Sequence, residues 1–179
     1  MQPATRTRGF TLIELMVTVA VLAILLSIAV PSFSDMIHNN QAAAQTNLLV
    51  ASLNQARSEA SKRGMPVTVC AANAALTTCS GDATTWKNGW LIFTDAPPGA
   101  AGVIDGGDLV LEKSMIPNSQ MSFTSGVDFA RFNAGGAKTN APGVDLTIDV
   151  KHVTCTGANK RHVEINNTGR ISMRKVACP

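Results

Sequence analysis

A run of nineteen residues without a charged side chain, residues 15–33, constrains this chain more than any other feature: LMVTVAVLAILLSIAVPSF. As a helix it is about long enough to cross the ~30 Å hydrocarbon core of a membrane. A secretory signal peptide would carry a small-residue cleavage site after its apolar region, and AVPSFSD at the end of the run fits that pattern poorly. Arg6 and Arg8 precede the run and favour a cytoplasmic N-terminus. The run therefore predicts a membrane-anchoring helix.

One acid, Glu14, stands where that helix enters the membrane, and a charge there is costly and normally has a partner. If the chain is cut after Gly9, Phe10 becomes the first residue and carries a free amine, one helical turn before Glu14. The carboxylate can then pair with the amine of its own chain or of a neighbouring subunit. Cleavage also removes Arg6 and Arg8 and leaves an apolar stem that can pack against other stems. Glu14 is therefore predicted to set the register of assembly.

The stretch GFTLIEL, residues 9–15, resembles the class III signal of type IV pilins and type II secretion pseudopilins. The resemblance implies that residues 1–9 are a leader peptide and that a prepilin peptidase cuts between Gly9 and Phe10. It also implies that the amine of Phe10 is methylated and that Glu14 is the assembly glutamate.

Apolar residues continue at helical spacing after the uncharged run, at Ala42, Leu49, Leu53, Ala56 and Ala60. Gly64 and Pro66 end the pattern. One helix from about Thr11 to Lys62 is expected, with an apolar first half (residues 10–33) and an amphipathic second half (residues 34–64). About fifty residues reach ~75 Å, which is too long for a compact domain of this size, so the first half is expected to project.

The remainder, residues 65–179, alternates apolar and polar residues as β-strands do, in PVTVCA, GWLIFTD, DLVLEKS, VDFARFN, VDLTIDVKHV, RHVEINN and RISMRKV. Turn-rich segments such as NAGGAKTNAPG separate these runs. An α+β fold is therefore predicted, in which an antiparallel β-sheet domain packs on the amphipathic half of the helix.

Three later stretches resemble the GspH/FimT branch of pseudopilins and minor pilins: LNQARSEASKRG, WKNGWLIFTD and INNTGRI, at residues 53–64, 86–95 and 165–171. Members of this branch are the type II secretion pseudopilin H, the minor pilin FimU and the DNA-binding minor pilin FimT. The resemblance implies a pilin-like fold and a structural subunit without enzymatic activity. The function expected is that of a FimU-like minor pilin in the complex that primes type IV pili. A pseudopilin H and a FimT-like DNA-binding pilin are the alternatives.

The resemblance also implies partners and a location. The partners are the prepilin peptidase, the other minor pilins and the major pilin. The expected location is the bacterial inner membrane, crossed once, with the globular domain in the periplasm, followed by assembly into a pilus or pseudopilus.

The four cysteines, Cys70, Cys79, Cys155 and Cys178, form no C-x-x-C pair and lie at no zinc-ligand spacing. Two disulfides in an oxidising compartment are therefore expected in place of a metal site. Three pairings are open, and loop closure favours the local ones, Cys70–Cys79 and Cys155–Cys178.

No catalytic motif is present: the chain has no G-x-S-x-G, no H-E-x-x-H and no P-loop. The three histidines, His38, His152 and His162, lie in separate segments and are expected to be solvated or paired across strands. Asp105 and Asp108 match no EF-hand spacing and are expected in a hairpin turn. No catalytic residue, metal or cofactor is expected.

The C-terminal end is basic. Residues 34–150 hold seven basic and ten acidic side chains, a balance of −3, whereas residues 151–179 hold six and one, a balance of +5. The candidate phosphate-binding residues are Lys160, Arg161, Arg170, Arg174 and Lys175. DNA-binding members of the branch carry Gly-Arg-x-Arg, but here Ser172 stands where the second arginine belongs. DNA binding is therefore the minor alternative, and solvated charges at a strand edge are the simpler interpretation.

Overall fold

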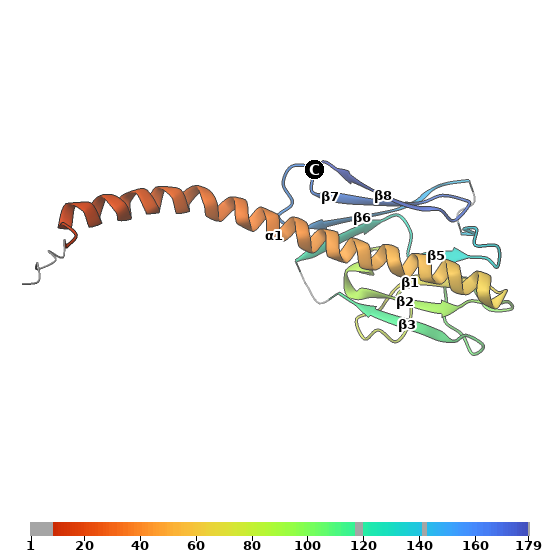
Figure 1. The fold of residues 1–179 in the computed structure, drawn as a ribbon. Coiled ribbons are helices and arrows are strands. Elements are labelled where there is room, and N and C mark those ends of the chain that lie inside the picture. The colour runs from red at the N-terminus through yellow and green to blue at the C-terminus, as the bar shows by residue number, and fades with distance from the viewer. Residues whose placement is uncertain (1–8, 117–119, 141–142, 179) are drawn as a thin grey trace, which may run out of the picture. The chain divides into compact units, whose positions relative to one another are not determined.

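The computed structural model describes residues 9–116, 120–140 and 143–178 (Figure 1). The chain divides into two compact units, residues 1–37 and 38–179. Helix α1, Leu12–Arg63, is the single long helix that the sequence predicts, and it begins and ends one residue later in the chain than expected. The long N-terminal helix and the antiparallel sheets confirm the predicted α+β, pilin-like fold class.

The unit of residues 38–179 contains two four-stranded antiparallel sheets. The first has the order β3-β2-β1-β5, with β1 Val67–Ala71, β2 Gly89–Thr94, β3 Val110–Met115 and β5 Phe129–Phe132. The second has the order β4-β6-β7-β8, with β4 Met121–Ser125, β6 Leu146–His152, β7 Lys160–Ile165 and β8 Ile171–Val176. In the second sheet, neighbouring strands are consecutive along the chain, except that β5 of the first sheet lies between β4 and β6 in the sequence.

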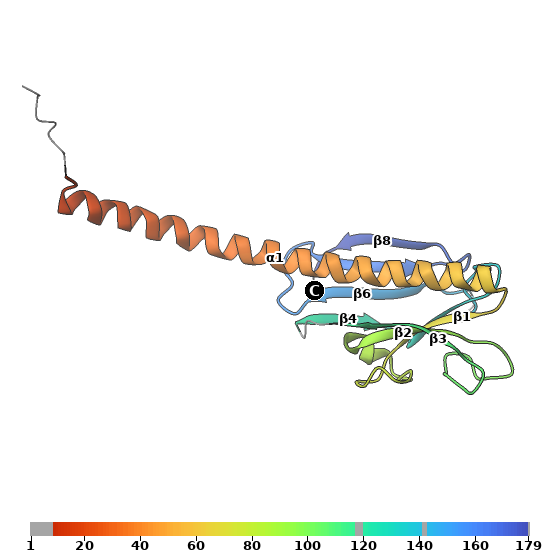
Figure 2. The ribbon, with the colours of Figure 1, turned by 60° about the horizontal axis from the view of Figure 1, so that its bottom comes forward.

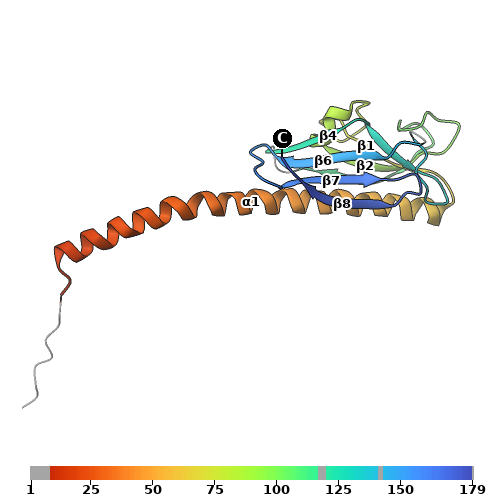
Figure 3. The same ribbon diagram turned by 90° about the horizontal axis from the view of Figure 1, so that it is seen from above.

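Residues 38–63 of α1 lie across both sheets (Figures 1 and 2), and Figure 3 shows this part of the helix along one side of the strands. The five residues predicted at helical spacing are each at most 1% exposed: Ala42, Leu49, Leu53, Ala56 and Ala60. They share one core with the inward side chains of the first sheet, such as Val69 and Ile92, and of the second, such as Ile148 and Val163. The helix therefore joins the two sheets through one hydrophobic core, which is the main source of stability for this unit.

A smaller core lies on the opposite face of the first sheet, around Cys70, Ala72, Leu91 and Phe93. Side chains from the loops that follow β1 and β2 cover it, among them Leu76 and Ile104. Because β1 and β2 are covered on both faces, every residue of these strands is buried.

The sequence patterns do not predict two of the observed elements. Strand β4, MSFTS, alternates correctly, with Met121 and Phe123 buried, but offers only two apolar residues in five. The 3-10 helix η1, Ala83–Asn88, follows Asp82, whose carboxylate accepts a hydrogen bond from the Thr84 amide at 2.8 Å. Both are too short for periodicity to reveal, and packing in the folded unit determines them.

Candidate functional site

The predicted cleavage site lies in non-helical backbone just before α1, and Gly9 and Phe10 are both exposed. A Cβ atom added to Gly9 would meet no other atom of the described chain within 4 Å. Glycine at this position is therefore not a requirement of the fold. An exposed, non-helical segment is accessible to a protease.

Thr11 and Glu14 cap the beginning of α1. The Glu14 amide donates to Thr11 Oγ1 at 3.3 Å, and the Thr11 amide donates to Glu14 Oε2 at 3.5 Å. This is a capping box, in which a threonine and a glutamate three residues later satisfy the amides that the first helical turn leaves free. The 3.5 Å bond is long, and Glu14 is exposed. The carboxylate therefore has a partner in the single chain but remains accessible to another.

Residues 12–30 of α1 expose apolar side chains all around the helix, and each large one is more than half exposed, including Leu15, Val21, Leu25 and Val30. Within the described part of the chain, α1 is the one helix long and apolar enough to cross a membrane. Such a surface is stable in contact with lipid or with other apolar helices, not with water.

Two disulfides are formed, Cys70–Cys79 and Cys155–Cys178, which are the pairings that loop closure favours. Cys70–Cys79 holds the loop after β1 onto the smaller core, beside a bridge between Ala72 and Cys79. Cys155–Cys178 joins the loop after β6 to the residues that follow β8, where the Cys178 amide also donates to the Gly157 carbonyl oxygen at 2.8 Å.

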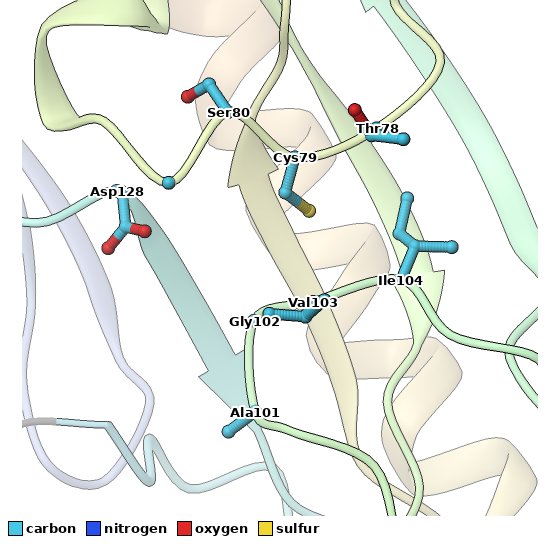
Figure 4. Close-up of a pocket in the computed structure, with 9 residues that line it drawn as sticks. Thr78, Cys79, Ser80, Ala101, Gly102, Val103, Ile104 and Asp128 are labelled. Carbon is cyan, nitrogen blue, oxygen red and sulfur yellow. The ribbon is translucent and has the colours of Figure 1, made fainter.

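A cavity of about 270 Å³ lies beside the first disulfide, between the loop of residues 78–81, the loop of residues 101–104 and the start of β5 (Figure 4). Asp128 is the only titratable side chain in its lining, with the hydroxyls of Thr78 and Ser80 nearby. This lining offers neither a nucleophile with a base nor a set of metal ligands. The lining of this cavity therefore does not indicate a catalytic or metal-binding site.

The structure brings two of the histidines together, contrary to the expectation of solvated or strand-paired rings. His38 of α1 and His152 of β6 are stacked, with ring centroids 3.8 Å apart. Burial lowers the pKa of His152, and the nearby His38 adds to the effect. Sequence patterns do not reveal this pair, because His38 is 114 positions from His152 and its helical position alone looks exposed.

The third histidine lies on the face of the second sheet away from the helix. His162 Nδ1 is 2.6 Å from Asp149 Oδ1, and Lys160 Nζ is 3.0 Å from Asp149 Oδ2. Burial opposes ionisation of Asp149, but the hydrogen bonds from His162 and Lys160 outweigh it and hold the pKa of this carboxyl below its usual value. Among residues 9–116, 120–140 and 143–178, no group of three or more His, Cys, Asp or Glu side chains is placed to hold a metal ion.

The candidate phosphate-binding residues do not form one surface. Arg161 is 4% exposed and donates to Asn39 Oδ1 at 2.5 Å, so the prediction that it belongs to an exposed phosphate-binding surface is wrong. Lys160 is engaged by Asp149. Both residues begin β7.

The exposed cations that remain are dispersed. Arg170 lies in the turn before β8, outside the strand. Arg174 is opposite His162, whereas Lys175 is opposite the inward-facing Arg161, so the two point to different faces of the sheet. Glu164 lies across from Ser172 on the face that carries Arg174. The outer face of the sheet is therefore mixed in charge.

The stretches that carry the family resemblance are structural. Trp86 and Trp90 are completely buried. Asp95, 1% exposed, accepts from Thr68 Oγ1 at 2.6 Å and from the Gly102 amide at 2.9 Å, and lies 3.3 Å from Arg131 Nε. The loop of residues 96–109 is therefore anchored to the first sheet through one buried carboxylate.

Gly169, in the third of these stretches, has a φ of 75° and lies against the Gly136 carbonyl oxygen, which a Cβ atom would strike. The conformation and the close approach both require glycine here. The turn before β8 is thereby packed on the loop after β5.

Comparison with known proteins gives two family matches. The model described as type II transport protein GspH matches residues 45–169, and the prokaryotic N-terminal methylation motif matches residues 5–30. No curated relative matches the sequence at a significant level.

Two crystal structures of the type IV minor pilin FimU from Pseudomonas aeruginosa share the fold. The form in space group P21 has 23% sequence identity and a TM-score of 0.55, over 79% of this chain and 92% of the other. The form in space group P65 has 23% identity and a TM-score of 0.51, over 75% and 91%.

The GspH match covers well over half of the chain, and the methylation motif covers the predicted cleavage site and most of the apolar helix. The exposed apolar half of α1 and the helix-bound sheets agree with both. The chain therefore belongs to the GspH family and is a pilin-like structural subunit of the minor-pilin and pseudopilin kind.

Proposed function

We propose that this chain is a minor pilin of a type IV pilus, cut after Gly9, methylated on the amine of Phe10 and incorporated through its apolar helix. The observation that carries the proposal is the beginning of α1. There a glycine that the fold does not require, a glutamate in a capping box and an exposed apolar helix surface follow one another within a few residues.

The position of Glu14 supports a link between cleavage and assembly. Glu14 Oε2 is 3.5 Å from the Thr11 amide, so an amine on the preceding residue, Phe10, is within reach of a small side-chain movement. A cut after Gly9 turns the Phe10 amide into a cation. In apolar surroundings a lone ammonium or carboxylate is strongly unfavourable, whereas a pair is tolerated. Pairing between neighbouring subunits therefore fixes the axial register of the helices.

The proposal assigns a role to each part of the chain. Residues 1–9 are the leader peptide, residues 10–33 the membrane and filament helix, residues 34–64 the amphipathic helix, and residues 65–179 the globular β domain. Arg6 and Arg8 keep the leader in the cytoplasm. The globular domain is then periplasmic, where two disulfides are stable.

The fold shared with FimU supports a pilus over a secretion system, and the two disulfides favour it weakly. The partners proposed are the prepilin peptidase, the other minor pilins and the major pilin. The non-enzymatic role is part of the same proposal. The name of the matching family, type II transport protein GspH, keeps a pseudopilus subunit as the alternative.

Deletion of the gene in its own bacterium, with complementation by wild type, separates these two functions. A minor pilin is required for surface pili, so the sheared filament fraction should be lost while the export of folded enzymes continues. Loss of enzyme export with normal pili would assign the chain to a secretion pseudopilus instead. If both surface pili and enzyme export stay normal in the deletion strain, the pilus function and the secretion function are both contradicted.

A further inference from the structure

The stacked histidines join α1 to the second sheet at the first residue of the globular unit. His38 is that first residue, and His152 is the last residue of β6. Their ring planes are 7° from parallel, and the Thr154 hydroxyl lies 3.1 Å from His38 Nδ1 and 2.8 Å from His152 Nδ1. His152 is 6% exposed and His38 is half-buried. Three side chains from two separate elements therefore make a single contact.

The hydrogen bonds define the protonation state that this contact needs. The Thr154 backbone amide donates to His152 Nδ1 at 3.2 Å. An amide can only donate, so His152 Nδ1 acts as an acceptor and carries no proton, and the ring is neutral. The Thr154 hydroxyl therefore donates to His152 Nδ1 and accepts from Nδ1–H of His38. Protonation of His152 Nδ1 would place its N–H group against the N–H group of the Thr154 backbone amide.

On the second sheet, the charged groups on the face that carries His152 are cations. On β7, Arg161 points inward and its Nη1 has no hydrogen-bond partner among the described residues. On β8, Lys175 is opposite Arg161. On β6, Asp149 and Lys151 alternate to the other face, and Asp149 is engaged by Lys160 and His162.

The neighbouring strand β4 and the loop after β6 add no charge. Strand β4, where Met121 is opposite His152, has no titratable residue, and neither have residues 153–154 or 156–159 after β6. Along the helix, the nearest acid in sequence is Asp35, three residues before His38. Among the described residues on the sheet side, therefore, no carboxylate is placed to stabilise a protonated pair.

We propose that His38 and His152 form an acid-sensitive clasp. The neutral rings stack and hold the beginning of the globular part of α1 on the second sheet, and protonation opens this contact. Two unit charges 3.8 Å apart repel by an amount that changes an equilibrium constant about sixfold at the dielectric of water, and by more inside a protein. The proposal does not depend on the function proposed above.

The direction of the pH dependence follows from the pKa of His152, which burial lowers first and the charge of His38 lowers further. A group with a lowered pKa in the fold contributes full stability above its ordinary value, about 6.5 for histidine. That contribution is lost as the pH falls below this value. The clasp is therefore closed at neutral pH and opens in mild acid.

Hydrogen exchange of the full chain in detergent micelles tests the clasp, at about pH 7.5 and about pH 5, with exchange times scaled for the intrinsic rates. In acid, the amides of residues 42–45, which bond back to the turn that holds His38, should lose at least about sixfold in protection. The far end of the helix, residues 53–63, should keep its protection. Equal protection of residues 42–45 at both pH values in the wild-type chain would overturn the proposal.

Two variants make the test specific. His38→Phe keeps a planar ring that can stack but cannot take a proton, so protection at the two pH values should agree within about twofold. His162→Gln is the matched control, because it removes the histidine of the opposite face, and it should respond to acid as the wild type does. An undiminished acid response in His38→Phe would refute the clasp.

A second readout separates the clasp from a general loss of stability. In carbon-13 spectra of the histidine rings, His38→Phe should raise the pKa of His152, because it removes the neighbouring positive charge. An unchanged titration of His152 would show that the two rings are not coupled, and the proposal would fail.

Discussion

Thr11 and Glu14 hold each other at the beginning of α1, where each side chain accepts a hydrogen bond from the other residue's backbone amide. Glu14 therefore has one role within the chain and, in the proposed function, a second role between chains. The two roles need different chemistry, because capping requires only an acceptor oxygen whereas pairing with an amine requires a charge.

Glu14→Gln should separate these roles. The amide oxygen of Gln can cap the helix, so processing and folding should remain normal, but incorporation into filaments should fall as far as it does in Glu14→Ala. The measurement is the amount of each variant in the sheared filament fraction, relative to the amount in the membrane. If Gln supports incorporation as well as Glu does, the carboxylate charge has no part in assembly.

Gly9→Val should block removal of the leader. The structure leaves space for a Cβ atom at this exposed position, so the globular domain should fold as in the wild type, and a processing defect would then reflect recognition by the peptidase. Gel mobility and the mass of the N-terminal peptide report the processing. Resistance of the globular domain to protease digestion is the control, and accumulation of the mature form would show that the cut lies elsewhere.

Loss of the second disulfide through paired Cys155→Ser and Cys178→Ser substitutions should lower the free energy of unfolding by about 3 kcal/mol. The Cys70–Cys79 pair should cost somewhat less, because it closes 9 residues instead of 23. Denaturant unfolding followed by circular dichroism measures both. Peptide mapping without reductant checks the pairing, and a Cys70–Cys155 peptide would contradict it.

Asp149→Asn should weaken the fold in a pH-dependent way. The wild-type carboxyl has a lowered pKa, so its contribution is present above the ordinary value of about 3.9 and disappears as the pH falls through the lower folded value. At neutral pH the variant should lose up to about 1 kcal/mol, since the side chain is a quarter exposed. The difference from wild type should vanish in strong acid.

Asp128→Asn is the matched control for this measurement, because Asp128 makes no ion pair among the described residues. It should reproduce the pH dependence of the wild type. A loss in Asp149→Asn that is equally large in strong acid would show that packing, not charge, explains the effect.

Duplex DNA should bind weakly, if at all, at about 150 mM salt. Arg170, Arg174 and Lys175 lie on different faces or in a turn, Arg161 is buried, and Asp149 and Glu164 share the outer face. A mobility-shift assay of the full chain in micelles, with the Arg170→Ala/Arg174→Ala double variant as the control, measures this. A clear shift that the double variant abolishes would move the protein to the DNA-uptake class.

Sequence patterns predict the parts of this fold that depend on long periodic stretches. The buried face of α1 follows from residues such as Leu49 and Leu53, whose spacing is set by the helix itself. Seven of the eight strands also appear in the patterns, because alternation extends over most of each one. Strand β4 is missed, because MSFTS is too short and too polar to stand out from a loop.

The contacts between distant segments are not predictable in the same way. The stack of His38 on His152 depends on where the helix lies on the second sheet, which is a property of packing and not of local spacing. The sequence predicts an exposed Arg161 because arginine is mostly exposed in folded proteins, but its register opposite Val150 directs it to the helix-facing side.

The chain has two tryptophans and no tyrosine, and both indole rings are completely buried in the globular unit. Nearly all of its near-ultraviolet absorption and intrinsic fluorescence therefore arise from two chromophores in one core. The emission should be blue-shifted and protected from quenchers in the monomer, and filament assembly through the apolar helix should leave it unchanged. A red shift in a variant would report disruption of the globular core, separately from any defect in assembly.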